Sequence, residues 1–282
     1  MVLKQKTLKK EVVFHGRGLF TGQDAVVRLI PAAPHSGIVF RRTDLAGAPI
    51  IPAKTEQVKE AIRCTKLVVD GQHSVQTIEH FMAAVQASEI DNLIVENSAS
   101  EMPIFDGSSK AFIQMIDEAG TVEQAAAKDL YVLDQPVAWA QEDMHLVALP
   151  SDEYRISYTL HYPQSPYLRS QFYSFVVRPE TFRQDIASCR TFTLYQEIAP
   201  LIEKGLLKNA NLDCGVVIDG DKVLNPDGVR FPDEMVRHKI LDIIGDFALL
   251  GCHFHAHLIA IKTGHAANHS AAKELRKFLR KK

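Results

Sequence analysis

The sequence lacks several features that mark whole classes of protein. It has four cysteines in 282 residues and no CxxC pair, so we expect reduced thiols, with neither a zinc knuckle nor a disulfide framework. No apolar run approaches the roughly 18 residues of a membrane span, and the basic N-terminus has no apolar signal-peptide core, so we expect a cytoplasmic protein. A formal net charge of −2 offers no strong attraction to nucleic acid or a bilayer.

The stretch FPDEMVRHKILDIIGDFALLG, residues 231–251, predicts one helix that begins near Pro232 and stops at Gly251. Apolar residues recur along it at helical spacing, while His238, Asp242 and Asp246 follow one another at i, i+4 and i+8 as a second stripe. An imidazole and a carboxylate one turn apart can hold a divalent metal. A solvated polar face would explain the same stripe, so this helix alone leaves both interpretations open.

A second predicted helix is HSVQTIEHFMAAVQA, residues 73–87, with Ser74 as its N-cap. Glu79 and His80 lie off its apolar face. A glutamate beside a histidine on a helix could be a base next to a metal ligand. An ordinary surface pair is the more common explanation of such a dipeptide.

The order of the predicted elements repeats along the chain. Helix, strand and helix are expected at 74–87, 91–97 and 109–119, and again at 233–250, 257–262 and 266–280. This repetition predicts a duplicated unit of a sheet plus two helices, with a linker at 120–130. If the two halves pack face to face, His80 and His238 could meet at the interface.

Two further stretches have competing explanations. His253, His255 and His257 alternate on one face of a predicted strand, which we interpret as a wet strand edge, because three ligands on one flat strand rarely converge on an ion. His265 follows Gly264 and is expected in an exposed turn, where catalytic side chains often sit. Residues 190–218 form an apolar excursion that is either ordinary core or a greasy groove.

Together these residues resemble the UDP-3-O-acyl-N-acetylglucosamine deacetylase family, zinc enzymes that commit Gram-negative cells to lipid A synthesis. The likeness is carried by TIEHFMAAV, IDNLIVE, EMPIFDGSS, SCRTF, VLNPDGVRFPDEMVRHKILDIIGD and KTGHAANH. It implies an α+β fold of two duplicated β-α-α-β sandwich domains, at 1–125 and 126–282, with their helices face to face. Each domain would carry an insert, and the one at about 190–220 would bind an acyl chain.

The resemblance also implies a role for particular residues. One catalytic Zn²⁺ would be held by His80, His238 and Asp242. The implied catalytic groups are the general base Glu79, the acid His265, its orienter Asp246 and the carbonyl-polarising hydroxyl of Thr191. The implied substrate-binding residues are Lys239 and Lys262 for the sugar and diphosphate, and Phe192, Ile198, Leu207 and Leu212 for the acyl chain. Phe20 stands where the family commonly has a histidine, so it is left out of the site.

The implied reaction is hydrolysis of the N-acetyl group of UDP-3-O-(3-hydroxyacyl)-N-acetylglucosamine, which gives UDP-3-O-acyl-glucosamine and acetate. The expected partner is this small molecule, with no nucleic acid and no membrane span, although the enzyme could come transiently near the inner membrane. We expect a monomer. Two alternatives stay open: a zinc amidohydrolase acting on another acylated sugar nucleotide, and a carrier that binds acyl-sugar nucleotides without hydrolysing them. Metal content and acetate release separate them.

Overall fold

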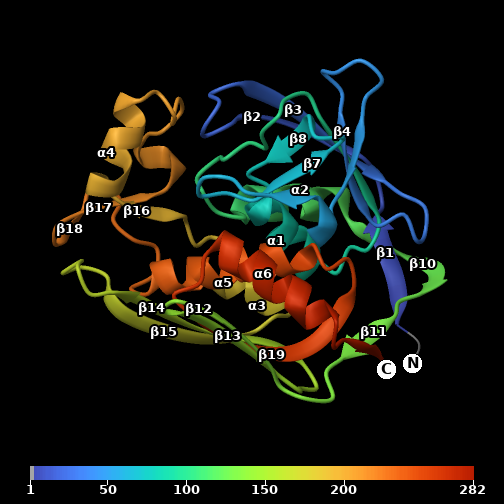
Figure 1. Cartoon of the computed structure of the whole chain (residues 1–282). Helices are drawn as coiled ribbons and strands as arrows, with labels where there is room; N and C mark the ends of the chain where they lie inside the picture. The colour runs from blue at the N-terminus through green and yellow to red at the C-terminus, as the bar shows by residue number, and fades with distance from the viewer. Residues whose placement is uncertain (1–2) are drawn as a thin grey trace.

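The computed structural model describes residues 3–282 and places the central helices between two β-sheets (Figure 1). Helices α1 (Glu79–Ala87) and α2 (Lys110–Ala119) belong to the first half of the chain, and α5 (Glu234–Ala248) and α6 (His265–Arg276) to the second. Helix α2 packs on the first sheet, α5 and α6 pack on the second, and α1 meets α5 in the middle. This mixture of helices and largely antiparallel sheets confirms the predicted α+β class.

The first sheet is antiparallel except where its central strand meets β4. Its strand order is β2 (Val12–Arg17), β3 (Asp24–Pro31), β9 (Leu93–Asn97), β4 (Ile38–Arg42) and β5 (Ile50–Pro52). Strand β9 runs antiparallel to β3 and parallel to β4. Along β3 the side chains alternate between buried and exposed, because successive residues of a strand point to opposite faces.

The second sheet has the same arrangement. Its main strands follow the order β12 (Val137–Gln141), β13 (Met144–Leu149), β19 (His253–Ile261), β14 (Tyr154–Tyr162) and β15 (Arg169–Val176), and β19 also pairs with β11 (Leu130–Val132). Its central strand, β19, is again antiparallel to one neighbour, β13, and parallel to the other, β14. Equal strand orders are what a duplication would produce; the duplication and the domain boundaries remain predictions.

The remaining elements fill the edges of this sandwich. They are β1 (Lys4–Leu8), β6 (Val58–Lys59), β7 (Lys66–Val69), β8 (His73–Gln76), β10 (Thr121–Ala127), α3 (Pro179–Asp185), β16 (Phe192–Leu194), α4 (Tyr195–Glu203), β17 (Val216–Asp219), β18 (Lys222–Val223), β20 (Arg280–Lys281) and two short 3-10 turns at Thr55–Gln57 and Leu212–Cys214. None of the helices within residues 3–282 is long and apolar enough to cross a membrane.

Helices α1 and α5 approach each other very closely at Gly245. A Cβ atom built on Gly245 would lie 2.1 Å from the backbone oxygen of Glu79, so only glycine fits there without moving a helix. Both helices are buried on nearly all sides. The polar stripe of α5 therefore faces the interior, and its interpretation as a solvated face is wrong.

Two sequence-based boundaries need correction. The helix expected from Ser74 begins at Glu79, because residues 73–76 pair as β8 with β7 and Thr77 has a φ of 58° that breaks the chain direction. The expected linker at 120–130 is not a loop: residues 121–127 form β10, which pairs with β1. A domain boundary in this segment remains a prediction. Each segment pairs with another strand, and the local sequence pattern does not reveal that partner.

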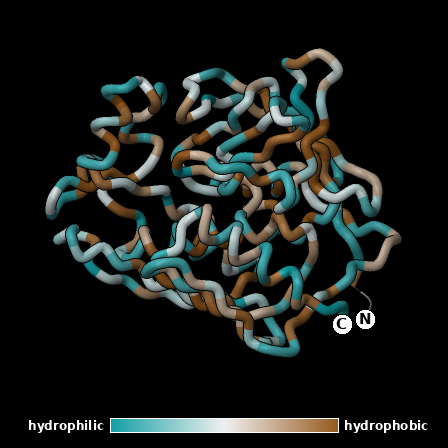
Figure 2. Tube along the Cα trace, in the orientation of Figure 1, coloured by the Kyte–Doolittle hydropathy of each residue, from teal (hydrophilic) through white to brown (hydrophobic). Residues whose placement is uncertain are grey.

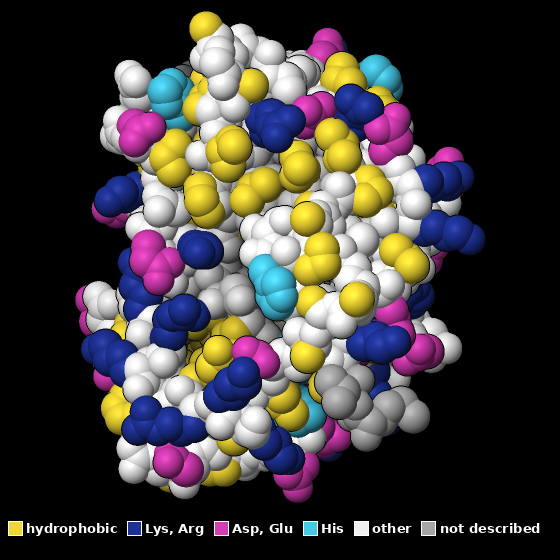
Figure 3. Space-filling model, turned by 90° about the vertical axis from the view of Figure 1, so that its right-hand side faces the viewer, with side chains coloured by type: hydrophobic (Ala, Val, Ile, Leu, Met, Phe, Trp, Pro, Cys, Tyr) yellow, Lys and Arg dark blue, Asp and Glu magenta, His cyan; other side chains and the backbone are white. Residues whose placement is uncertain are grey.

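The distribution of side chains agrees with the composition. Hydrophobic residues concentrate along the trace where sheets and helices face each other (Figure 2). On the side shown in Figure 3, apolar side chains gather in the upper half, and basic and acidic side chains are interspersed over the rest. All four cysteines are free in this structure.

Candidate active site

The three predicted metal ligands converge between the two halves of the chain. His80 comes from α1, and His238 and Asp242 come from successive turns of α5. One ligand atom from each lies within 4.8 Å of the others, and all three side chains are buried. The Nε2 atoms of His238 and His80 lie 3.2 and 3.8 Å from Asp242 Oδ1. The fold thus brings together residues that are separated by more than 150 positions in the chain.

The chemistry of this cluster fits a divalent metal ion. Asp242 Oδ1 is buried and has no hydrogen-bond partner, although a buried carboxylate oxygen is costly to leave unsatisfied. The two imidazole rings stand edge to face, with centroids 4.9 Å apart. Two imidazoles and one carboxylate are a ligand set of catalytic zinc sites, which keep a further position open. A metal ion would satisfy the oxygen that the protein leaves without a partner.

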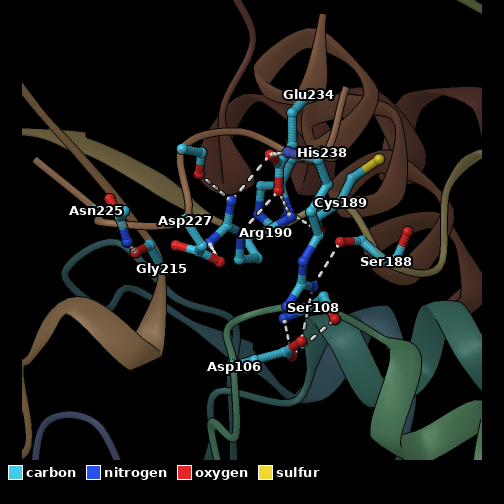
Figure 4. A network of polar contacts seen from close by, with 12 residues as sticks. Asp106, Ser108, Ser188, Cys189, Arg190, Gly215, Asn225, Asp227, Glu234 and His238 are labelled. Atoms are coloured by element: carbon cyan, nitrogen blue, oxygen red, sulfur yellow. Dashed lines mark hydrogen bonds and ion pairs between the residues drawn. The ribbon is translucent and has the colours of Figure 1, made fainter. Parts of the chain in front are cut away.

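The ring of His238 is oriented by a hydrogen bond from Nδ1, the ring nitrogen that is not directed at the other ligands. Its Nδ1 donates to the backbone oxygen of Cys189 at 3.0 Å, which leaves the lone pair of Nε2 facing Asp242 and His80. Figure 4 shows how the Cys189 segment is held: the Arg190 guanidinium lies against the Glu234 carboxylate, with Nε 2.9 Å from Oε1. Glu234 also accepts from the backbone nitrogen of Arg190 at 2.9 Å. This buried pair fixes the carbonyl that orients the ring.

The protonation states of the cluster suit metal binding. Burial, and then the neighbouring His238, lower the pKa of His80 to about 3. Burial alone would raise the pKa of Asp242, but Lys239, whose Nζ is 2.7 Å from Oδ2, outweighs it and holds that pKa well below its usual range. Neutral imidazoles and an ionised carboxylate are the forms that bind metal.

Glu79 stands beside the cluster at the start of α1. Burial raises the pKa of its carboxyl to about 7, although His265 opposes the rise. Its Oε2 accepts from the backbone nitrogen of Thr65 at 2.9 Å, and its Oε1 lies 3.9 Å from His265 Nε2. A carboxylate held in this way can take up a proton near neutral pH, as a general base must.

His265 and Asp246 form a charged pair. His265 Nδ1 donates to Asp246 Oδ2 at 2.9 Å. Burial would lower the pKa of His265, but Asp246, with Asp242, raises it to about 10. The expectation of an exposed turn is wrong, because His265 is the first residue of α6 and only 17% of its side chain is exposed.

The site contains further polar residues that the sequence did not indicate. Asp246 accepts further hydrogen bonds from Thr65 Oγ1 at 2.6 Å and from Asn268 Nδ2 at 2.8 Å, and His269 Nε2 lies 2.9 Å from Thr65 Oγ1. The spacing of His265, Asn268 and His269 within KTGHAANH places them on one helical face, a signal that could have found them. Thr65 carries no such signal.

The remaining predicted polar residues make different contacts. Lys239 reaches Asp242, as described above. Lys262 forms an ion pair with Asp143, which lies in the turn between β12 and β13. Thr191 is fixed through its backbone, which donates to Gly107 O at 2.8 Å and accepts from Val216 N at 2.7 Å. Roles for these residues toward a substrate remain predictions.

The four predicted acyl-chain residues lie in the insert. Phe192 is in β16 and contacts Tyr162 with ring centroids 6.0 Å apart, Ile198 is in α4, and Leu207 and Leu212 follow α4. None of the four is fully buried, although Phe192 packs against the edge of the hydrophobic core. The insert meets the first half of the chain where Asn209 N donates to Leu19 O at 3.1 Å.

The alternating histidines of β19 form no ligand cluster within the described part of the chain. His257 Nε2 instead lies 2.8 Å from Ser157 Oγ on the neighbouring strand. The expected strand edge is wrong, because β19 lies inside the sheet and His257 is paired with β13 on one side and β14 on the other.

Comparison with known proteins gives consistent matches over almost the whole chain. The family model described as "LpxC: UDP-3-O-acyl N-acetylglycosamine deacetylase" matches residues 5–277. A UDP-3-O-acyl-N-acetylglucosamine deacetylase of Chlamydia caviae is 46% identical over 275 residues, covering 98% of each chain. Proteins of the same name from Chlamydia felis and Chlamydia pneumoniae are 46% and 44% identical, covering 94% and 96% of both chains.

Proposed function

The chain belongs to the UDP-3-O-acyl-N-acetylglucosamine deacetylase family, and we propose that it works as a zinc amidase through the cluster of His80, His238 and Asp242. It is a hydrolase of lipid A biosynthesis that removes the N-acetyl group from its acylated UDP-sugar. The carrier alternative finds no support among the relatives. The observation that supports the metal assignment is that ligand atoms of three buried residues lie close together. One of these atoms, Asp242 Oδ1, has no hydrogen-bond partner.

Zinc bound by these ligands would supply a Lewis acid and lower the pKa of a water ligand to about 7. Glu79 would be the base that takes a proton from the attacking water. The pKa of about 7 at Glu79 matches it to a base working near neutral pH.

His265 is proposed to act as the acid, which gives up a proton where Glu79 takes one. It is kept protonated by Asp246 and lies across from Glu79, so it can donate a proton to the sugar nitrogen as the amide bond breaks. This donation is needed because an amide nitrogen leaves poorly as an anion. The hydroxyl of Thr191 is proposed to donate to the carbonyl oxygen as negative charge develops on it.

The rest of the substrate is proposed to bind outside this centre. Lys239 and Lys262 supply positive charge for the sugar and diphosphate. The half-exposed residues of the insert, Ile198 and Leu207 among them, line a passage for the 3-O-acyl chain. Binding energy from a chain remote from the reacting bond can be used to position the acetamide. A cytoplasmic location, a monomeric state and zinc in preference to another divalent ion are further parts of the proposal.

Acetate release by Glu79→Gln tests the proposal. The variant should retain zinc and bind substrate, yet release acetate at least about a hundredfold more slowly, as expected when one general base is lost. Glu274→Gln, which removes an exposed carboxylate that pairs with Lys277 on the far part of α6, should leave the rate unchanged. Full activity of Glu79→Gln would contradict the assigned mechanism, and zinc measured on the same sample shows whether the site itself is intact.

A further inference from the structure

One buried threonine contacts both halves of the proposed acid–base machinery. Thr65 precedes β7 and only 2% of it is exposed. Its backbone nitrogen donates to Glu79 Oε2 at 2.9 Å, and its hydroxyl donates to Asp246 Oδ1 at 2.6 Å. The base on α1 and the orienter of the acid on α5 are therefore attached to the same residue.

Asp246 fixes the direction of the Thr65 hydroxyl, and that direction decides the role of His269 on α6. An ionised carboxylate only accepts hydrogen bonds, so the single hydroxyl proton of Thr65 must point to Asp246. The contact of 2.9 Å between Thr65 Oγ1 and His269 Nε2 is then one in which His269 donates. The imidazole must carry its proton on Nε2, and its buried Nδ1 has no partner. Two hydrogen bonds with defined donors therefore link the three residues: His269 donates to Thr65, and Thr65 donates to Asp246.

We propose that Thr65, with its hydroxyl held by His269, is a positioning residue that fixes Glu79 and the Asp246–His265 pair relative to each other. The inference rests on the proposed roles of Glu79 and His265. Those two groups must act on one amide from either side, and their nearest atoms are 3.9 Å apart. A small misplacement of catalytic groups is costly to the rate. Without the Thr65 hydroxyl, Asp246 keeps Asn268 and His265 as donors but loses the link to the segment that holds Glu79.

Thr65→Val and Thr65→Ser form the first test. Valine keeps the shape and the backbone donor to Glu79 but removes the hydroxyl, whereas serine restores it. We expect kcat for acetate release to fall about tenfold in Thr65→Val, as for the loss of a hydrogen bond to a charged group, with KM within about twofold of wild type. Thr65→Ser should recover most of kcat. A purely structural role would lower the melting temperature and leave kcat of the folded fraction unchanged.

A readout independent of turnover is the imidazole nitrogen spectrum of metal-free protein labelled with ¹⁵N-histidine. Wild type and Thr65→Ser should show His269 protonated on Nε2 and unprotonated on Nδ1. Thr65→Val should change the His269 and His265 signals together, because both rings are linked through Asp246. The titratable groups around these two hydrogen bonds are Glu79 from α1, Asp246 from α5, and His265 and Lys273 from α6.

A double-mutant cycle separates action through Thr65 from independent packing. His269→Leu removes the donor, and His269→Gln offers an amide donor in its place. We expect His269→Leu to lower kcat about threefold to tenfold and His269→Gln to restore it in part, and the double variant Thr65→Val/His269→Leu to be no slower than Thr65→Val alone.

Several outcomes would overturn this inference. They are unchanged kcat in Thr65→Val, equal loss in Thr65→Ser and Thr65→Val, or additive effects in the double variant. Failure here is distinguishable from failure of the proposed function: if Glu79→Gln is inactive while Thr65→Val is fully active, only the positioning role is wrong. If Glu79→Gln keeps full activity, the acid–base assignment itself is wrong.

Discussion

Helix α5 and helix α4 both carry predicted site residues, yet they lie in very different surroundings. Helix α5 has 13 buried residues among 15, including both of its proposed metal ligands, whereas α4 has no buried residue and contains Pro200 in its interior. A buried helix can hold ligand atoms to within tenths of an ångström, which metal chemistry needs. A half-exposed helix can adjust to a flexible chain. The comparison suggests that the reacting centre is rigid and the acyl-chain region is adaptable.

The largest expected effect is on the metal. His238→Ala removes a ligand from the rigid region, so purified protein should lose most of a bound ion that is otherwise present at about one per chain, and activity with it. Elemental analysis measures the stoichiometry. His257→Ala is the matched control, because His257 lies on β19 and bonds Ser157 outside the cluster. A His238→Ala variant with full stoichiometry would contradict the ligand assignment.

The next test concerns the rigidity itself. Gly245→Ala puts a Cβ against the backbone of Glu79, so α1 and α5 must separate, and overpacking of this kind costs about 2 kcal/mol. Denaturant unfolding should show the loss, and activity should fall because Glu79 and His80 move. A Cβ on Gly264 meets no atom within 4 Å, so Gly264→Ala should change stability little. Equal stability of both variants would mean that the helices are not closely fixed.

The pH dependence tests the charged pair in the rigid region. Glu79 works ionised, so activity should rise as pH passes about 7, and His265 works protonated, so activity should fall as pH passes about 10. Asp246→Asn removes the anion that raises the pKa of His265, so the basic limb should move about one pH unit or more toward lower pH. Asp117→Asn, on the surface, should leave both limbs in place. If Asp246→Asn does not move the basic limb, His265 is not the acid.

The smallest effect is expected in the adaptable region. Leu207→Arg should lower kcat/KM for the 3-O-acylated substrate about tenfold and barely affect a substrate without the chain, because a charge would enter an apolar passage. Leu206→Arg, at a neighbouring position that is 45% exposed, should have a smaller effect. Equal losses on both substrates would mean that Leu207 supports the fold and does not contact the chain.

The same contrast explains how much the sequence can predict. His238 and Asp242 are recognisable because helical spacing puts them one turn apart, and the family resemblance supplies His80 and Glu79 from the other half. The sequence does not indicate Thr65, because its two contacts are with Glu79 and Asp246, which lie 14 and 181 positions away. The group that orients His238 is the backbone carbonyl of Cys189, which every residue type would supply, so the sequence does not indicate it.

Element boundaries are less predictable than element types. Local pattern starts the helix at 79–87 several residues too early because Ser74 looks like an N-cap, but pairing of β8 with β7 takes those residues into a sheet. Residues 120–130 look like a linker because alanines and charges dominate them, and only the distant partner β1 makes them a strand. In both places pairing with another strand outweighs local preference.

The position of β19 between β13 and β14 has a consequence for how the chain is made. Strand β19 begins at His253, about a hundred residues after its neighbours, and it joins them on both edges. During synthesis the edges of β13 and β14 stay open until β19 leaves the ribosome, and open edges are where chains aggregate. Contacts between segments so distant in sequence also slow folding. A nascent chain that stops before residue 253 should depend on chaperones, although it already contains all three proposed metal ligands.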